Sequence, residues 1–161
     1  MYPKSDVSII VEILQQVESP TSDGTMRYRY TSSLFIILYS HIYLPPRFHF
    51  DSLAHDNSAQ FAEIERIFEI PNDGGENTPP AIALKGLQIV SKFNSTVANK
   101  VRIMMAVFRV ESKATDVVVT FNIPLVSVNG GTVENEGAVE SEADFHTFVR
   151  SFCIVDLGLF A

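Results

Sequence analysis

The sequence predicts a single α+β domain in which an antiparallel β-sheet is flanked by helices, an α/β/α sandwich. Two observations carry this prediction. Three apolar, β-branched segments follow one another in the second half of the chain, and only the segment SKAT joins the last two, as in a β-hairpin. Segments of helical periodicity precede and follow them. The chain has 161 residues, which one domain with a full core accommodates.

The first element, SDVSIIVEILQQVES, is predicted to be a helix. Asp6 or Ser8 can cap its start, and Pro20 and Gly24 end it. The Ile-Ile-Val segment is β-prone, so its intrinsic preference opposes this interpretation. The residues that fall on one face at helical spacing are Ile9, Ile10, Ile13, Leu14 and Val17.

In the middle of the chain, the pattern of apolar residues predicts a short helix near residues 48–55. The residues that follow it are expected to be either helical or extended. The segment PNDGGENTPP, residues 71–80, has the composition of a loop. The three strands are expected at residues 81–94, 100–111 and 115–125. Their near-continuous apolar runs indicate that both faces of the sheet are covered.

The C-terminal part begins with a Gly- and Glu-rich loop, residues 128–145, whose acidic run is a solvated segment or an electrostatic guide for a basic partner. A capping-box-like start at Ser141 to Asp144 predicts a final helix. The apolar stripe of this helix consists of Phe145, Phe148, Val149 and Phe152.

The most apolar run in the chain is SLFIILYSHIYLPP, residues 33–46. A helix that crosses a bilayer needs about 20 mostly apolar residues, so this run is too short, and Pro45 and Pro46 are expected to end it. Its β-branched and aromatic content suits a buried strand.

Composition narrows the function classes. The net charge is −7, with no visible basic stripe, so nucleic acid is not an expected partner, and an acidic protein is better suited to a basic protein surface. The single cysteine, Cys153, cannot form an internal disulfide, and the N-terminus resembles no signal peptide. We therefore expect a reducing compartment and no membrane association.

No constellation of residues indicates covalent chemistry, a metal or a cofactor. The four histidines, at positions 41, 49, 55 and 146, are interpreted as unrelated surface or packing residues, because no acid or cysteine completes a metal set. Cys153 and His146 are two helical turns apart and could form a nucleophile pair, but Cys153 is interpreted as a small core residue. The chain is expected to be a binding domain that is not an enzyme.

Several segments, in order, resemble the Ran guanine nucleotide release factor family, the small Ran-binding proteins of nuclear import. The most specific is TDVVVTFNIPL at residues 115–125, which is similar to T-D-[VL]-[VL]-[VIL]-x-x-N-x-P. The others are SIIVEIL at 8–14, RFHFDSLA at 47–54, the strand from Leu87 to Asn94, Arg109 after an apolar strand, and the ending FCIVD with LFA. They cover most of residues 6–20 and 47–161.

This resemblance implies binding to the GTPase Ran, release of its guanine nucleotide, and a location in nucleus and cytoplasm. Family members begin with an L-[FY]-G-G-A strand, a helix and an acidic P-D-x-Q-E segment that contacts Ran. We find none of these here, so the family's N-terminal strands are expected to be missing and no contact residue is carried over. The alternative is an accessory protein with the related photosystem-subunit-like fold.

A second departure concerns the link between the SIIVEIL and FHF segments, which is short in the family. Here residues 25–46 intervene as an atypical apolar insertion. We interpret it as foreign to the fold, a translated intron or another gene-model artefact. The alternative is a genuine insertion that supplies a strand to the open sheet edge. In either case the prediction is one incomplete domain over residues 1–161.

The partner-binding residues are predicted from charge and position, not from a motif. Acidic side chains next to the missing segment would meet a basic surface of Ran. They are Asp6, Glu12, Asp51 and Asp56. The competing interpretation is that Asp6 caps a helix and the other three are simply solvated.

Overall fold

The computed structural model describes residues 6–16, 33–91, 98–127, 132–133 and 135–160, with the side chains of α1 described from Pro45 onward. The order of elements is β1 (Ser8–Gln15), α1 (Ser33–Asp56), β2 (Phe61–Ile70), β3 (Ala81–Ser91), β4 (Ala98–Val110), a 3-10 turn (Glu111–Lys113), β5 (Thr115–Val126), α2 (Asn135–Ser151) and a second 3-10 turn (Leu157–Leu159).

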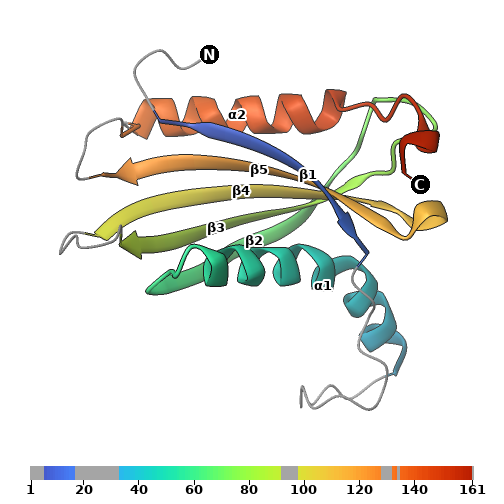
Figure 1. Cartoon of the computed structure of the whole chain (residues 1–161), viewed down its shortest axis with the longest axis horizontal. Helices are drawn as coiled ribbons and strands as arrows, with labels where there is room; N and C mark the ends of the chain where they lie inside the picture. The colour runs from blue at the N-terminus through green and yellow to red at the C-terminus, as the bar shows by residue number, and fades with distance from the viewer. Residues whose placement is uncertain (1–5, 17–32, 92–97, 128–131, 134, 161) are drawn as a thin grey trace.

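The five strands form one antiparallel sheet in the order β1-β5-β4-β3-β2. Strands β2 to β5 form a meander, whereas β1 pairs across the whole chain with β5, Ser8 opposite Asn122. Figure 1 shows α2 on one face of the sheet and α1 on the other. The predicted antiparallel sheet flanked by helices is confirmed, as are its last three strands, the hairpin between β4 and β5, and the loop at residues 71–80.

The first element is a strand, so the helix predicted there is wrong. Ile9 lies opposite Phe121 and Ile10 opposite Thr120, and the β-branched segment extends along β5 instead of coiling. Apolar residues at positions 9, 10, 13 and 14 satisfy a helical period, but they also supply both faces of a strand. The long-range pairing with β5 decided between the two, in agreement with the intrinsic β-preference of the segment.

Helix α1 is much longer than the helix predicted near residues 48–55, because it begins at Ser33. Pro45 and Pro46 lie inside it, both buried, and do not end it. Figure 1 shows that the helix bends between its first turns and the part that lies on the sheet, as expected where prolines interrupt the backbone hydrogen bonds.

The run at residues 33–46 is therefore helical, and the alternative that it supplies a strand is wrong. That the insertion at residues 25–46 is foreign to the fold stays a prediction. No helix within the described residues is long and apolar enough to span a membrane.

The predicted apolar stripe of α2 is confirmed. Phe145 and Val149 are fully buried in the larger core, with Phe148 and Phe152 packed against it. The predicted capping box is wrong, since the helix starts at Asn135, and the Ser141 hydroxyl donates within it to the Gly137 carbonyl at 2.7 Å. The structure thus places most of the expected acidic loop on a helix.

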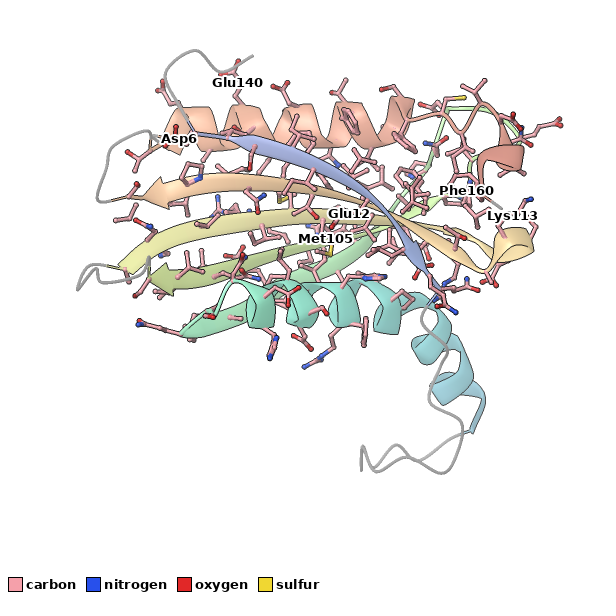
Figure 2. The ribbon with its side chains drawn as sticks, viewed as in Figure 1. Asp6, Glu12, Met105, Lys113, Glu140 and Phe160 are labelled. Carbon is pink, nitrogen blue, oxygen red and sulfur yellow. The ribbon has the colours of Figure 1, made fainter. Side chains whose placement is uncertain are left out.

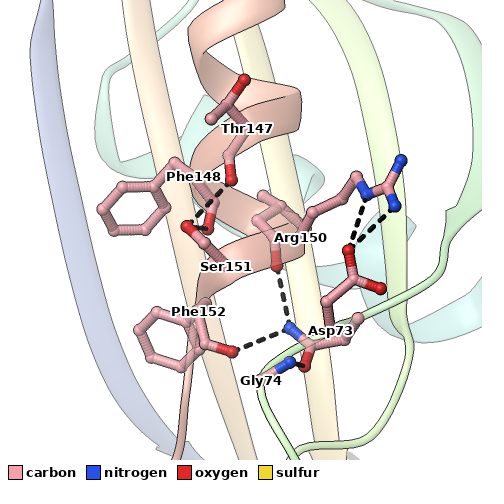
Figure 3. Close-up of polar contacts among 9 residues, drawn as sticks. Asp73, Gly74, Thr147, Phe148, Arg150, Ser151 and Phe152 are labelled. Carbon is pink, nitrogen blue, oxygen red and sulfur yellow. Dashed lines mark hydrogen bonds and ion pairs between the residues drawn. The ribbon is translucent and has the colours of Figure 1, made fainter.

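Two further contacts hold α2 on the sheet. The Glu142 carboxylate accepts from Lys85 of β3 at 2.7 Å and from Arg102 of β4 at 2.8 Å. At the other end of the helix, shown in Figure 3, the Asn72 amide donates to the carbonyls of Val149 and Phe152 at 2.9 and 2.8 Å. These bonds satisfy carbonyls that a helix end leaves without intrahelical partners.

Cys153 follows α2 and is exposed, so the prediction that it is a core residue is wrong. The ring of His146 instead stacks on Phe68 at 5.5 Å between centroids. Phe152 and Ile154, on either side of Cys153, supply the buried contacts of this segment.

Candidate protein-binding groove

The two faces of the sheet are covered unequally. Helix α1 packs on β2, β3 and β4, where Phe50 is buried against Leu84, Ile103 and Met105. The close approach depends on Gly86, because a Cβ atom there would lie 2.7 Å from the Phe50 ring. Since α1 is centred over β3, it leaves space between itself and the strands β5 and β1.

This space is a groove with a volume of about 380 Å³. We refer to it as the β1–α1 groove. Its floor is formed by Met105, Val118 and Thr120 of the sheet, and Figure 2 shows Glu12 and Met105 on neighbouring parts of the sheet. The remaining lining residues come from its two walls and are Glu12, Leu14, Gln15, Phe48, His49, Ser52, Leu53 and Asp56.

The groove combines apolar surface with negative charge. Glu12 on β1 and Asp56 on α1 contribute carboxylates from opposite walls, and the described lining contains no lysine or arginine. Phe48 and Leu14 lie beside them and are exposed. An apolar floor with acidic walls suits a cationic side chain whose aliphatic stem can lie on the floor.

A buried polar cluster fixes the inner wall of the groove. The Nε2–H of His49 donates to the Asp116 carboxylate at 3.1 Å, and Arg109 donates to its other oxygen, also at 3.1 Å. Asp116 is fully buried and His49 nearly so. The cluster joins α1 to β5 and β4, so it positions the helix that carries Phe48 and Asp56.

The charge state of this cluster follows from its contacts. Burial acts to raise the pKa of Asp116, but the hydrogen bonds from His49 and Arg109, with the charge of Arg109, outweigh it and hold the pKa below its ordinary value of 3.8. Asp116 is therefore a carboxylate at neutral pH. The carboxylate accepts hydrogen bonds from both His49 and Arg109. It thereby lowers the free-energy cost of burying these two side chains.

The structure brings together two of the four predicted partner-binding residues, Glu12 and Asp56, although 44 positions separate them in the sequence. Asp51 is exposed on α1 near Arg47, with 3.9 Å between the charged atoms, and does not line the groove. Asp6 is exposed just before β1, so it caps no helix.

Sequence reasoning missed Phe48 and His49 as parts of a site. Both were visible in the FHF segment, but His49 was interpreted as an unrelated packing residue. Its partner Asp116 lies 67 positions away, at the start of β5, and only the tertiary fold brings them together. Nothing among the described residues forms a group of three or more acidic, histidine or cysteine side chains able to hold a metal ion.

Comparison with known proteins agrees with this fold. The chain belongs to the family of Ran-interacting Mog1 proteins, whose family model matches residues 1–124. It is 30% identical over 168 residues to the Ran guanine nucleotide release factor of Danio rerio, covering 99% of this chain and 80% of that protein. The probable Ran guanine nucleotide release factor of Dictyostelium discoideum is 27% identical over 167 residues, covering 98% and 77%.

A solved structure of a variant of Protein Mog1 resembles the chain with a TM-score of 0.52 and 21% identity, covering 96% of this chain and 71% of that one. At this identity the likeness shows the fold alone. The family resemblance seen in the sequence is thus confirmed by the family model and by two relatives.

Proposed function

We propose that this protein binds the GTPase Ran through the β1–α1 groove and promotes release of its guanine nucleotide, in support of nuclear protein import. Family membership and the names of the two relatives support Ran as the partner. The observation that carries the choice of surface is the pair of carboxylates, Glu12 and Asp56, on opposite walls of an apolar groove.

The mechanism needs no covalent step by this chain. If the protein binds nucleotide-free Ran more tightly than nucleotide-bound Ran, it weakens nucleotide binding by the same factor, because the two binding equilibria are linked. A tenfold difference corresponds to about 1.4 kcal/mol. A location in both nucleus and cytoplasm is part of this proposal, since an import factor must meet Ran in its different nucleotide states.

The test measures release of labelled GDP from Ran, with and without the protein, together with association rates at low and high salt. Glu12→Lys and Asp56→Lys should each slow association, and the loss should be larger at low salt, because complementary charges mainly steer the encounter. Glu140→Lys is the matched control, since this exposed residue makes the same charge change on α2.

Two results would contradict the proposal. Release of GDP at the spontaneous rate at every protein concentration would exclude the activity. Equal slowing by Glu140→Lys and Glu12→Lys would show that the total charge acts, and not the groove.

A further inference from the structure

Helix α1 is held on the sheet by two kinds of contact on different sides of its axis. Phe50 packs on β3, where its ring lies against Gly86. His49 instead reaches β5, where its Nε2–H donates to the Asp116 carboxylate at 3.1 Å. Neighbouring residues of a helix point about 100° apart, so the two contacts together fix the rotation of α1 about its own axis.

The acceptor of this hydrogen bond is itself held in place. Asp116 on β5 lies directly opposite Arg109 on β4. The guanidinium donates to both carboxylate oxygens, from Nε at 3.1 Å and from Nη2 at 3.4 Å. A fully buried carboxylate that accepts such a fork has little freedom to rotate. His49 therefore bonds to a fixed point of the sheet and not to a mobile side chain.

The side of α1 that faces the groove is a single helical stripe. The residues at the spacing i, i+3, i+4, i+7 that line the β1–α1 groove are His49, Ser52, Leu53 and Asp56. Phe48, also in the lining, has its ring edge-on to the imidazole at 5.7 Å between centroids. Side chains end about 5–6 Å from the helix axis, so a rotation of about 20° would move the Asp56 carboxylate by about 2 Å. Whatever sets the rotation of α1 therefore also sets the position of this carboxylate.

Stability alone does not account for a charged group at this contact. The neighbouring buried residues of the α1 face are all apolar and are Phe50, Leu84, Ile103, Met105, Val107 and Val118. Well-packed apolar residues of similar volume often stabilise a protein as much as a buried ion pair does, because burying charges costs free energy. A hydrogen bond differs from an apolar contact in being directional, since it weakens steeply when it is bent. The His49 bond is thus suited to fixing the orientation of the helix.

We propose that His49 is a positioning residue for partner binding. Its bond to Asp116 sets the rotation of α1 and so holds Phe48 and Asp56 where the partner meets them. The inference rests on the proposed function for the identity of the partner, but the orientation of the helix can be measured without Ran. His49 acts in this proposal through the helix and not by contact with the partner.

The first arm of the experiment measures the orientation of α1 in the full chain without Ran. His49→Leu removes the N–H and keeps a similar volume, while Asp116 retains Arg109 as its partner. Residual dipolar couplings of the amides of residues 48–56, compared with those of β4, report the rotation and tilt of the helix. We expect them to change in His49→Leu and to stay close to the original values in His49→Gln, whose amide Nε2 still donates.

The second arm tests whether His49 acts on Ran binding through Asp56. In the original chain Asp56→Asn should weaken the affinity for nucleotide-free Ran about fivefold, as expected for one charge interaction at a surface. In His49→Leu, which should itself bind about tenfold more weakly, the same change should cost less than about twofold, because the carboxylate is already displaced. The effects of two independent substitutions would instead multiply.

Val149→Ala is the matched control for a loss of stability alone. Val149 is buried on α2, which covers the opposite face of the sheet, so its truncation should destabilise the domain without moving α1. In this variant the dipolar couplings of α1 should be unchanged, and Asp56→Asn should keep its effect of about fivefold on affinity. Circular dichroism checks folding, and if His49→Leu does not fold, Asp116→Asn weakens the same bond from β5 and takes its place.

Two results would overturn the proposal. They are unchanged dipolar couplings in the folded variant that lacks the bond, and full multiplication of its effect on Ran affinity with that of Asp56→Asn. Absence of Ran binding by the original chain would overturn the proposed function and with it the role of His49 in binding. The dipolar couplings would still decide whether His49 orients α1, so the two failures are distinguishable.

Discussion

The two faces of the sheet differ in how they are packed. On the α2 face, aromatic rings pack directly, with Phe108 and Phe152 stacked at 4.8 Å and Phe121 edge-on to Phe145 at 5.3 Å. The α1 face has a smaller apolar cluster, a buried carboxylate and an open groove. The difference indicates that the α2 face contributes most of the tight apolar packing, while the α1 face, which carries the proposed binding groove, is packed less completely.

The largest expected effect belongs to the α2 face. Phe145→Ala should lower the free energy of unfolding by about 3–5 kcal/mol, the cost of removing a buried aromatic ring and leaving a cavity. Urea denaturation measures it, with Val139→Ala on the exposed side of the same helix as the control. A loss below about 1 kcal/mol would mean that α2 is not the stabilising layer.

On the α1 face, the buried group that we compare with Phe145 is the carboxylate of Asp116. Asp116→Asn should cost about 1.5–3 kcal/mol, because hydrogen bonds to a charged group are worth more than neutral ones. In this variant His49 and Arg109 lose the negatively charged acceptor to which both donate. Urea denaturation measures the loss, and no loss would show that the cluster is dispensable for stability.

The same variant has a pH signature. The pKa of Asp116 is lowered in the folded state, so its stabilising contribution is present above the unfolded-state value of about 3.9 and is lost as pH falls through the folded-state value. The unfolding free energy of Asp116→Asn should therefore fall less steeply with pH below about 4 than that of the original chain. If the unfolding free energies of the variant and the original chain fall in parallel below about pH 4, the stabilising role assigned to the charge of Asp116 is wrong.

A smaller effect is expected where α1 meets β3. Gly86→Ala places a Cβ atom 2.7 Å from the Phe50 ring and 2.8 Å from the Glu63 carbonyl oxygen, so helix or strand must shift. Overpacking of this kind costs about 1–3 kcal/mol. Thermal denaturation measures it, and an unchanged melting temperature would show that α1 can move off the sheet without penalty.

The smallest effect should come from the groove wall. Glu12→Gln removes an exposed charge that forms no described ion pair, so the free energy of unfolding should change by less than about 0.5 kcal/mol. Binding to Ran should nevertheless weaken if the groove is the docking surface. A clear loss of stability would mean that Glu12 is a structural residue. The α1 face would then also contribute to stability through its groove wall.

Local patterns were sufficient for the part of the fold built from sequence neighbours. The hairpin of β4 and β5, the loop at residues 71–80 and the stripe of α2 were all correctly predicted. They failed at β1, where Ile9, Ile10 and Ile13 suit a helix and a strand equally, and at Ser141, whose local capping pattern lies inside a helix. The distant pairing of β1 with β5 decided that β1 is a strand.

The candidate site was predictable only in part. Charge and position selected Glu12 and Asp56, which the structure brings to one groove, and also Asp51 and Asp6, which lie outside it. A partner-binding role for any of the four stays a prediction. His49 could not be paired with Asp116 from sequence, because a lone histidine and a lone aspartate 67 positions apart carry no spacing signal. The missing information was the tertiary arrangement that brings the start of β5 within hydrogen-bonding distance of α1.

The chain-spanning pairing of β1 also has a consequence for how the domain forms. Strands β2 to β5 are joined by hairpins between neighbours, whereas β1 closes a loop from Ser8 to Asn122, which costs more chain entropy. The meander should assemble first and β1 should join late and detach most readily. Native-state hydrogen exchange should then find the Glu12 amide less protected than that of Met105, and equal protection would mean that all five strands form as one cooperative unit.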